Sequence, residues 1–214
     1  MVIAIDGPAG AGKSTVARGV AAALGITYLD SGAMYRCVGL AALNAGVDPD
    51  DADAVTEIST GVEIGFEGER VWLDSEDVTV AIREPAVTAA ASRISVHPGV
   101  REAMVARQRE LIAKGPYVAE GRDIGTVVSP DAPLKVFLNA EGDERARRRS
   151  DQTGQPLSQV LADQNDRDAR DREREHGALR AAGDSVELDT TGVSVDEVIA
   201  RVVDLARERG IGGR

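Results

Sequence analysis

The residues best suited to chemistry stand near the start of the chain, in the stretch Gly7-Pro8-Ala9-Gly10-Ala11-Gly12-Lys13-Ser14. This stretch matches the pattern G-x-x-x-x-G-K-[ST], in which glycines allow successive backbone N–H groups to point at an anion. The lysine of such a loop reaches the β- and γ-phosphates of a nucleotide, and the hydroxyl after it can hold Mg²⁺. The sequence therefore predicts a phosphate-binding loop. Its predicted ATP-binding residues are Gly7, Pro8, Ala9, Gly10, Ala11, Gly12, Lys13, Ser14 and Thr15.

The segments around this loop are the ones that the motif requires. An apolar run at residues 2–6 predicts a strand, and the alanine- and valine-rich residues 15–24 predict a helix. Polar or glycine-containing loops follow the other short apolar runs too. These further predicted strands are residues 26–30, 117–119, 134–138 and 185–189. We expect an α/β fold with a five-stranded parallel sheet and a ligand site at the carboxyl ends of its strands.

The last helix is predicted most clearly. Ser194 and Glu197 form a capping box, and the apolar residues after them recur at helical spacing. One face of this helix should cover the sheet.

Residues 31–98 differ in character and predict an inserted lobe. Two alternating runs, 62–66 and 70–74, flank Glu67-Gly68-Glu69 and indicate an antiparallel hairpin. Residues 78–82 are expected to add a strand, and residues 85–95 and 100–114 to form helices.

Two later helices are rich in charge. The first, residues 142–151, contains Arg145, Arg147, Arg148 and Arg149, and residues 152–155 are expected to form a loop. In the second, residues 157–175, Arg167, Asp171 and Arg174 have the spacing i, i+4, i+7 and share one face. Spacing alone leaves two interpretations, a solvated helix with intrahelical ion pairs or a site for a phosphate or a sugar hydroxyl.

Composition narrows the class of function. The net charge of −11 argues against nucleic acid as the main partner, and no apolar run approaches the roughly 20 residues of a membrane span. Cys37 is the sole cysteine, which fits a reducing compartment. We expect a soluble, cytoplasmic monomer.

The chain offers little for metal-cluster or triad chemistry, because neither His97 nor His176 stands near a group of carboxylates or cysteines. A phosphate monoester acceptor would need no general base, since it is itself an anionic nucleophile. Alignment and charge neutralisation by a lysine, Mg²⁺ and arginines would then suffice. The absence of N-K-x-D disfavours a GTPase.

Taken together, several segments resemble the signatures of the bacterial cytidylate kinases. The matching segments are residues 5–14, 29–36, 120–128 and 131–138, and the pattern Arg167-Asp-x-x-Asp171-x-x-Arg174. The resemblance spans residues 2 to about 209. It implies a P-loop NTPase-type core (residues 1–30, 99–144 and 161–214), an NMP-binding insert at 31–98 and a short lid at 145–160.

The resemblance also implies roles for individual residues. Ser31, Arg101 and Asp123 would recognise the cytosine ring, Arg36 and Arg122 the phosphate of CMP, and Ser92, Arg167 and Asp171 its ribose, with Arg174 supporting the base site. Lys13, Arg122, Arg148 and Arg149 would act on the transferring phosphoryl group. Ser14 would bind Mg²⁺, and Glu120 would lie near the ion and act through water.

The implied activity is ATP-dependent, Mg²⁺-assisted phosphorylation of CMP and dCMP. Two alternatives remain at this point: a kinase of another acceptor, such as UMP or a small alcohol metabolite, and a nucleotide-binding regulatory module without turnover.

Overall fold

The computed structural model describes residues 1–212 and contains the predicted parallel sheet. Its strand order is β2-β6-β1-β7-β8. The strands are β1 (Val2–Asp6), β2 (Thr27–Asp30), β6 (Tyr117–Gly121), β7 (Leu134–Asn139) and β8 (Val186–Asp189). All four neighbouring pairs are parallel, so the five carboxyl ends lie along one edge. The predicted fold class is confirmed.

The register aligns the polar ends of three strands. Asp30 of β2 pairs with Glu120 of β6, and Asp6 of β1 pairs with Gly121 of β6. Residues two apart on one strand face the same side. Tyr28 and Asp30 therefore share a face of the sheet with Glu120.

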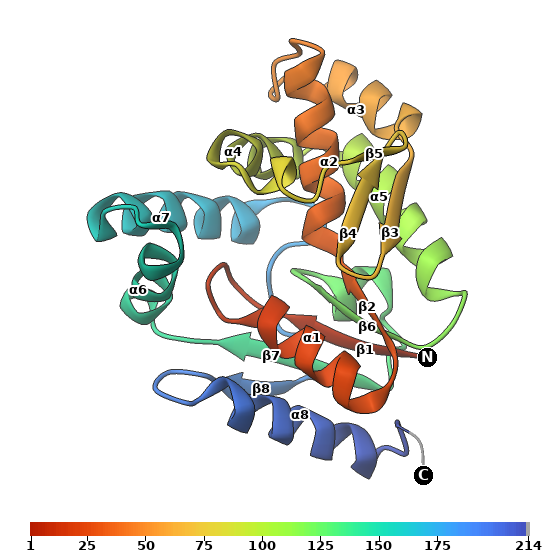
Figure 1. Ribbon diagram of the computed structural model, residues 1–214, viewed down its shortest axis with the longest axis vertical. Coiled ribbons are helices and arrows are strands. Elements are labelled where there is room, and N and C mark those ends of the chain that lie inside the picture. Colours follow the sequence, from red (N-terminus) through yellow and green to blue (C-terminus); the bar gives the residue numbers. More distant parts are fainter. Residues whose placement is uncertain (213–214) are drawn as a thin grey trace. The chain divides into compact units, whose positions relative to one another are not determined.

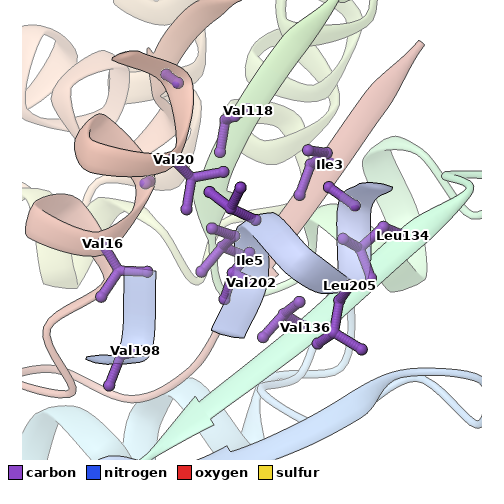
Figure 2. Packing of buried hydrophobic residues seen from close by; sticks show 14 of the residues in the cluster. Ile3, Ile5, Val16, Val20, Val118, Leu134, Val136, Val198, Val202 and Leu205 are labelled. Atoms are coloured by element: carbon purple, nitrogen blue, oxygen red, sulfur yellow. The ribbon is translucent and has the colours of Figure 1, made fainter. Parts of the chain in front are cut away.

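Helices α1 (Lys13–Leu24) and α8 (Val195–Glu208) pack together on this sheet (Figure 1). In Figure 2, Val20 of α1 and Val202 of α8 point toward Ile5 and Val118 of the strands, and all four side chains are buried. The predicted capping box starts α8: Ser194 accepts from the Glu197 N–H, and the Glu197 carboxylate accepts from the Ser194 N–H. This core fixes the strand ends that bear the polar loops.

The chain divides into two compact units, residues 1–30 with 109–214 and residues 31–108. The second unit contains α2 (Ser31–Asn44), α3 (Ala52–Gly61), α4 (Pro85–Ile94) and most of α5 (Pro98–Ile112). Its small sheet has the order β3-β4-β5, with β3 (Ile64–Glu67), β4 (Arg70–Leu73) and β5 (Glu76–Asp77) antiparallel. The predicted hairpin is confirmed.

The strand expected at residues 78–82 is wrong. Thr79 donates from both its N–H and its hydroxyl to Asp77, and its hydroxyl oxygen accepts from the Val71 N–H. These bonds turn the chain just after β5, and a 3₁₀ turn η1 (Ala81–Arg83) follows. Local side-chain bonds thus replace the ladder that the apolar pattern suggested.

The remaining elements of the first unit are the π-turn η2 (Ile124–Val128) and the helices α6 (Gly142–Thr153) and α7 (Leu157–Glu173). Helix α6 takes in two residues expected in the loop, and it ends at Gly154, whose φ of 69° suits a glycine. No helix within residues 1–212 is long and apolar enough to cross a bilayer.

Candidate active site

The loop between β1 and α1 has the backbone that the motif predicts. Gly12 has φ 85° and Gly7 φ 152°, both in the region that side chains avoid. A Cβ on Gly7 would lie 2.1 Å from the carbonyl oxygen of Leu138, so the loop passes directly against β7. The glycines are required by conformation and by space.

Helix α1 begins at Lys13 with its first-turn N–H groups uncapped by any side chain, and that turn holds no acidic residue. Such a terminus attracts an anion through its N–H groups and its partial positive charge. Lys13 lies across the loop, where its Nζ donates to the Pro8 carbonyl oxygen at 2.7 Å. The lysine side chain and the helix terminus thus present positive charge to the same loop.

The charge of Lys13 depends on its neighbours. The pKa of Lys13 is lowered to about 7, mainly by burial and also by the charges of Arg122 and Arg167, while the charges of Glu120 and Asp171 oppose this shift. Because a nucleotide phosphate would add negative charge beside it, its binding would favour the protonated ammonium.

Glu120, at the end of β6, is almost fully buried, with 4% of its surface exposed. Burial and the nearby Asp30 carboxylate raise the pKa of Glu120, whereas Lys13 and hydrogen bonds with Ser14 and Tyr28 lower it. Tyr28 Oη donates to Glu120 Oε1 at 2.5 Å. The strand ends therefore place acidic oxygen atoms beside the first turn of α1.

Asp6 holds the loop that follows β6. Its carboxylate accepts from the N–H groups of Ile124 at 2.8 Å and Gly125 at 2.7 Å, both immediately after Asp123. Burial raises the pKa of Asp6 to about 6, more than these two hydrogen bonds lower it. The carboxylate thus fixes the position of the predicted site residues Arg122 and Asp123 relative to the phosphate loop.

Helix α7 adds ionic contacts to the same region. Arg122 Nε lies 2.7 Å from Asp171 Oδ2, and Arg174 Nη1 lies 3.5 Å from Asp171 Oδ1. Burial raises the pKa of Asp171, but Arg122, Arg174 and Arg167 together hold it below its usual range. The helix predicted to reach residue 175 ends at Glu173, so Arg174 follows it in extended backbone; it nevertheless contacts Asp171, and both side chains are buried.

Helix α6 contributes arginines in three different environments. Arg148 donates to the Thr190 carbonyl oxygen at 2.7 Å and to Glu144 at 3.0 Å, whereas Arg149 lies on the exposed side. Arg145 is buried and donates to the Ala9 carbonyl oxygen at 2.8 Å. Arg145 also pairs with the buried Asp168 at 2.8 Å. Arg145, which the sequence did not predict for the site, therefore supports the phosphate loop.

The remaining predicted acceptor residues belong to the second unit. Ser31 opens α2 and is buried, Arg36 lies one turn later, and Ser92 is buried on α4. Arg101 of α5 is 4% exposed, with its guanidinium 5.9 Å from the ring centre of Tyr35. Their roles in binding an acceptor stay predictions.

The residues around the loop suit Mg²⁺. The ion prefers oxygen ligands and keeps several waters, and Ser14 offers a hydroxyl beside the carboxylate of Glu120, which in turn lies near Asp30. Among the described residues no group of three or more histidine, cysteine or acidic side chains forms a metal cage. This arrangement fits an ion shared between one hydroxyl, nucleotide phosphates and water.

Sequence reasoning missed three residues of this site. Asp6 stands directly before the glycine-rich loop, and that position is the one signal available for it. Tyr28 and Arg145 had no distinguishing signal, because their contacts with Glu120 and with Ala9 join segments far apart in the sequence.

Two solved structures share this fold. A gluconokinase from Sinorhizobium meliloti 1021 superposes with a TM-score of 0.53 at 18% identity, covering 98% of this chain and 93% of the other. A sugar kinase from Janibacter sp. HTCC2649 gives a TM-score of 0.53 at 14% identity, covering 100% and 98%. At these identities the likeness concerns the fold alone.

The sequence comparisons are more specific. A cytidylate kinase from Mycobacterium avium is 49% identical over 220 residues, covering 98% of this chain and 96% of the relative. One from Solibacter usitatus is 47% identical over 221 residues, covering 100% and 95%. The model of the family described as "Cytidylate kinase" matches residues 3–208. The phosphate loop, the buried lysine and the acidic strand ends are consistent with these matches. The chain belongs to the cytidylate kinase family.

Proposed function

We propose that this protein transfers the terminal phosphoryl group of ATP to CMP and dCMP, with Mg²⁺ as the metal ion. Family membership supports the reaction class and the nucleotide acceptor. The observation that supports catalysis is the position of Lys13, which is buried at the end of the phosphate loop. Arg122 and Arg167 lie close enough to lower its pKa, so several cationic side chains gather at this loop.

In this reaction the protein aligns the two nucleotides and neutralises the negative charge on the transferring phosphoryl group. The backbone N–H groups of the loop bind the β-phosphate of ATP, and the Lys13 ammonium leaves the Pro8 carbonyl to contact the γ-phosphoryl group. Arg122, Arg148 and Arg149 neutralise the charge that spreads over the transferring group. The acceptor phosphate attacks as an anion, so no side chain has to remove a proton.

Two parts of the chain would exclude water. Residues 31–98 serve as the acceptor-binding insert and residues 145–160 as the lid, closing over the nucleotides so that ATP is not hydrolysed. The active species is a monomer.

The acceptor residues follow the chemistry of cytosine. Asp123 accepts from the exocyclic amino group, and Arg101 with Ser31 binds the ring acceptors. Arg36 and Arg122 bind the acceptor phosphate. The further contacts, to the ribose and the base site, come from Ser92, Arg167, Asp171 and Arg174.

Mg²⁺ neutralises the polyphosphate when bound. The Ser14 hydroxyl would hold the ion, and Glu120 would act near it through water. The hydroxyl and carboxylate found beside the loop support this assignment.

The test is an acceptor panel. The purified protein is given Mg²⁺ and ATP with CMP, dCMP, UMP, AMP or shikimate, and ADP formation is followed. The highest kcat/KM is expected with CMP and dCMP. Turnover confined to an uncharged alcohol, or equal turnover with AMP and CMP, would contradict the proposal, and no turnover with any acceptor would favour a regulatory module.

A further inference from the structure

The side chain of Tyr28 makes a contact that the proposed reaction does not use. Its Oη donates to Glu120 Oε1 at 2.5 Å, and its ring packs against the core below α1. Tyr28 lies two residues before Asp30, which pairs with Glu120 across the sheet. The phenol therefore reaches diagonally along the sheet to the carboxylate from the neighbouring strand.

The ring of Tyr28 is itself held in place. The Arg18 guanidinium lies 5.9 Å from the ring centre, and Arg18 Nε donates to the Ser14 carbonyl oxygen at 3.2 Å. Arg18 and Tyr28 thus join the first turn of α1 to Glu120. Both contacts come from regular elements, a helix and a strand, so the phenol position is well defined.

Three side chains interact favourably with the Glu120 carboxylate: Lys13 through its charge, and Ser14 and Tyr28 through hydrogen bonds. In the proposed reaction Lys13 turns to the γ-phosphoryl group and Ser14 to Mg²⁺. Of the three, Tyr28 alone has no other role in that reaction, so its hydroxyl can stay bonded to Glu120 Oε1.

We propose that Tyr28 is a positioning residue that orients the Glu120 carboxylate toward the metal site of the Mg²⁺–ATP complex. This inference rests on the proposed function for the presence of Mg²⁺ and ATP. It does not depend on the identity of the acceptor.

The variant that tests it is Tyr28→Phe, which removes the hydroxyl and keeps the ring. Dissociation constants are measured by calorimetry for ATP with Mg²⁺ and for ATP with EDTA. The affinity for Mg²⁺–ATP should fall roughly tenfold, the effect of losing one hydrogen bond to a charged group. The affinity for metal-free ATP should stay within about twofold, because Tyr28 acts through the carboxylate at the metal site.

Tyr117→Phe is the matched control. Tyr117 begins β6 on the same sheet, and no hydrogen bond of its hydroxyl occurs within residues 1–212. Both of its dissociation constants should equal those of the unmodified protein. If Tyr28→Phe folds poorly by circular dichroism, Tyr28→Met makes the same prediction, since a flexible apolar side chain fills the space of the ring.

A double-mutant cycle distinguishes positioning from a general structural role. In the Glu120→Gln background, Tyr28→Phe should weaken Mg²⁺–ATP binding by less than about twofold, because the carboxylate it positions is already gone. A full further tenfold loss there, equal losses with and without Mg²⁺, or unchanged Mg²⁺–ATP binding in Tyr28→Phe would each overturn the proposal. Failure of CMP phosphorylation would contradict the proposed function and would leave these binding results interpretable.

Discussion

The buried carboxylate of Asp6 makes the stability of this protein depend on pH in a direction unusual for an aspartate. Asp6 is 5% exposed, and burial raises its pKa from 3.8 to about 6 in spite of two backbone hydrogen bonds. A raised folded-state pKa means that the folded protein binds the proton more tightly than the unfolded chain does. The stabilising contribution of the protonated group is therefore complete below pH 3.8 and is lost as the pH rises through about 6.

The size of the effect follows from the difference of about two pKa units. Each unit corresponds to about 1.36 kcal/mol, so the full change is about 3 kcal/mol between the protonated and the ionised limits. Between about pH 4.5 and about pH 7.5, a practical range for equilibrium unfolding, linkage gives a change of about 2 kcal/mol.

The assay compares the unmodified protein with Asp6→Asn by urea unfolding across this range. Asparagine offers one acceptor to two N–H donors, so the variant is less stable at every pH, but its side chain does not titrate. The difference in unfolding free energy between the two proteins isolates Asp6 from all other groups. This difference should shrink by about 2 kcal/mol from about pH 4.5 to about pH 7.5.

Asp184→Asn serves as the control. The pKa of the exposed Asp184 lies below its usual value because of its hydrogen bond with Lys135, so its difference profile should have the opposite sign and be small. A difference for Asp6→Asn that is constant, or that grows with pH, would refute the reasoning that burial outweighs the two hydrogen bonds.

Three further substitutions test the site. Lys13→Met should lower kcat at least ~10²–10³-fold in a coupled ADP assay, the scale for losing one transition-state donor, and near-normal turnover would remove Lys13 from the mechanism. Asp123→Asn should reduce the preference for CMP over UMP in kcat/KM, and an unchanged ratio would mean that the base is recognised elsewhere. Gly7→Ala should weaken ATP binding and lower the unfolding free energy by about 1–3 kcal/mol through overlap with Leu138. The control is Gly25→Ala, because Gly25 also has a positive φ but has open space around it, and this change should cost about 1 kcal/mol. Equal losses of unfolding free energy in the two variants would rule out the overlap.

Much of the fold was determined by local sequence. The apolar run of β1, the glycines and Lys13 are consecutive in the chain, so the strand, loop and helix could be predicted together. The capping box of α8 is equally local, because its two side chains bond to each other's backbone within one turn. Where side-chain hydrogen bonds competed with an apolar pattern, at Thr79, the prediction of a strand was wrong.

The tertiary structure decided which charged residues meet. Helical spacing placed Asp171 and Arg174 on one face, but it could not show that Arg122, some fifty residues earlier, is the partner of that carboxylate. In the same way, four arginines of α6 look alike in the sequence, and only packing selects Arg145 for the phosphate loop. The physical reason is that burial and charge pairing depend on the surroundings of a group in three dimensions, whereas strand, turn and helix preferences act between neighbours along the chain.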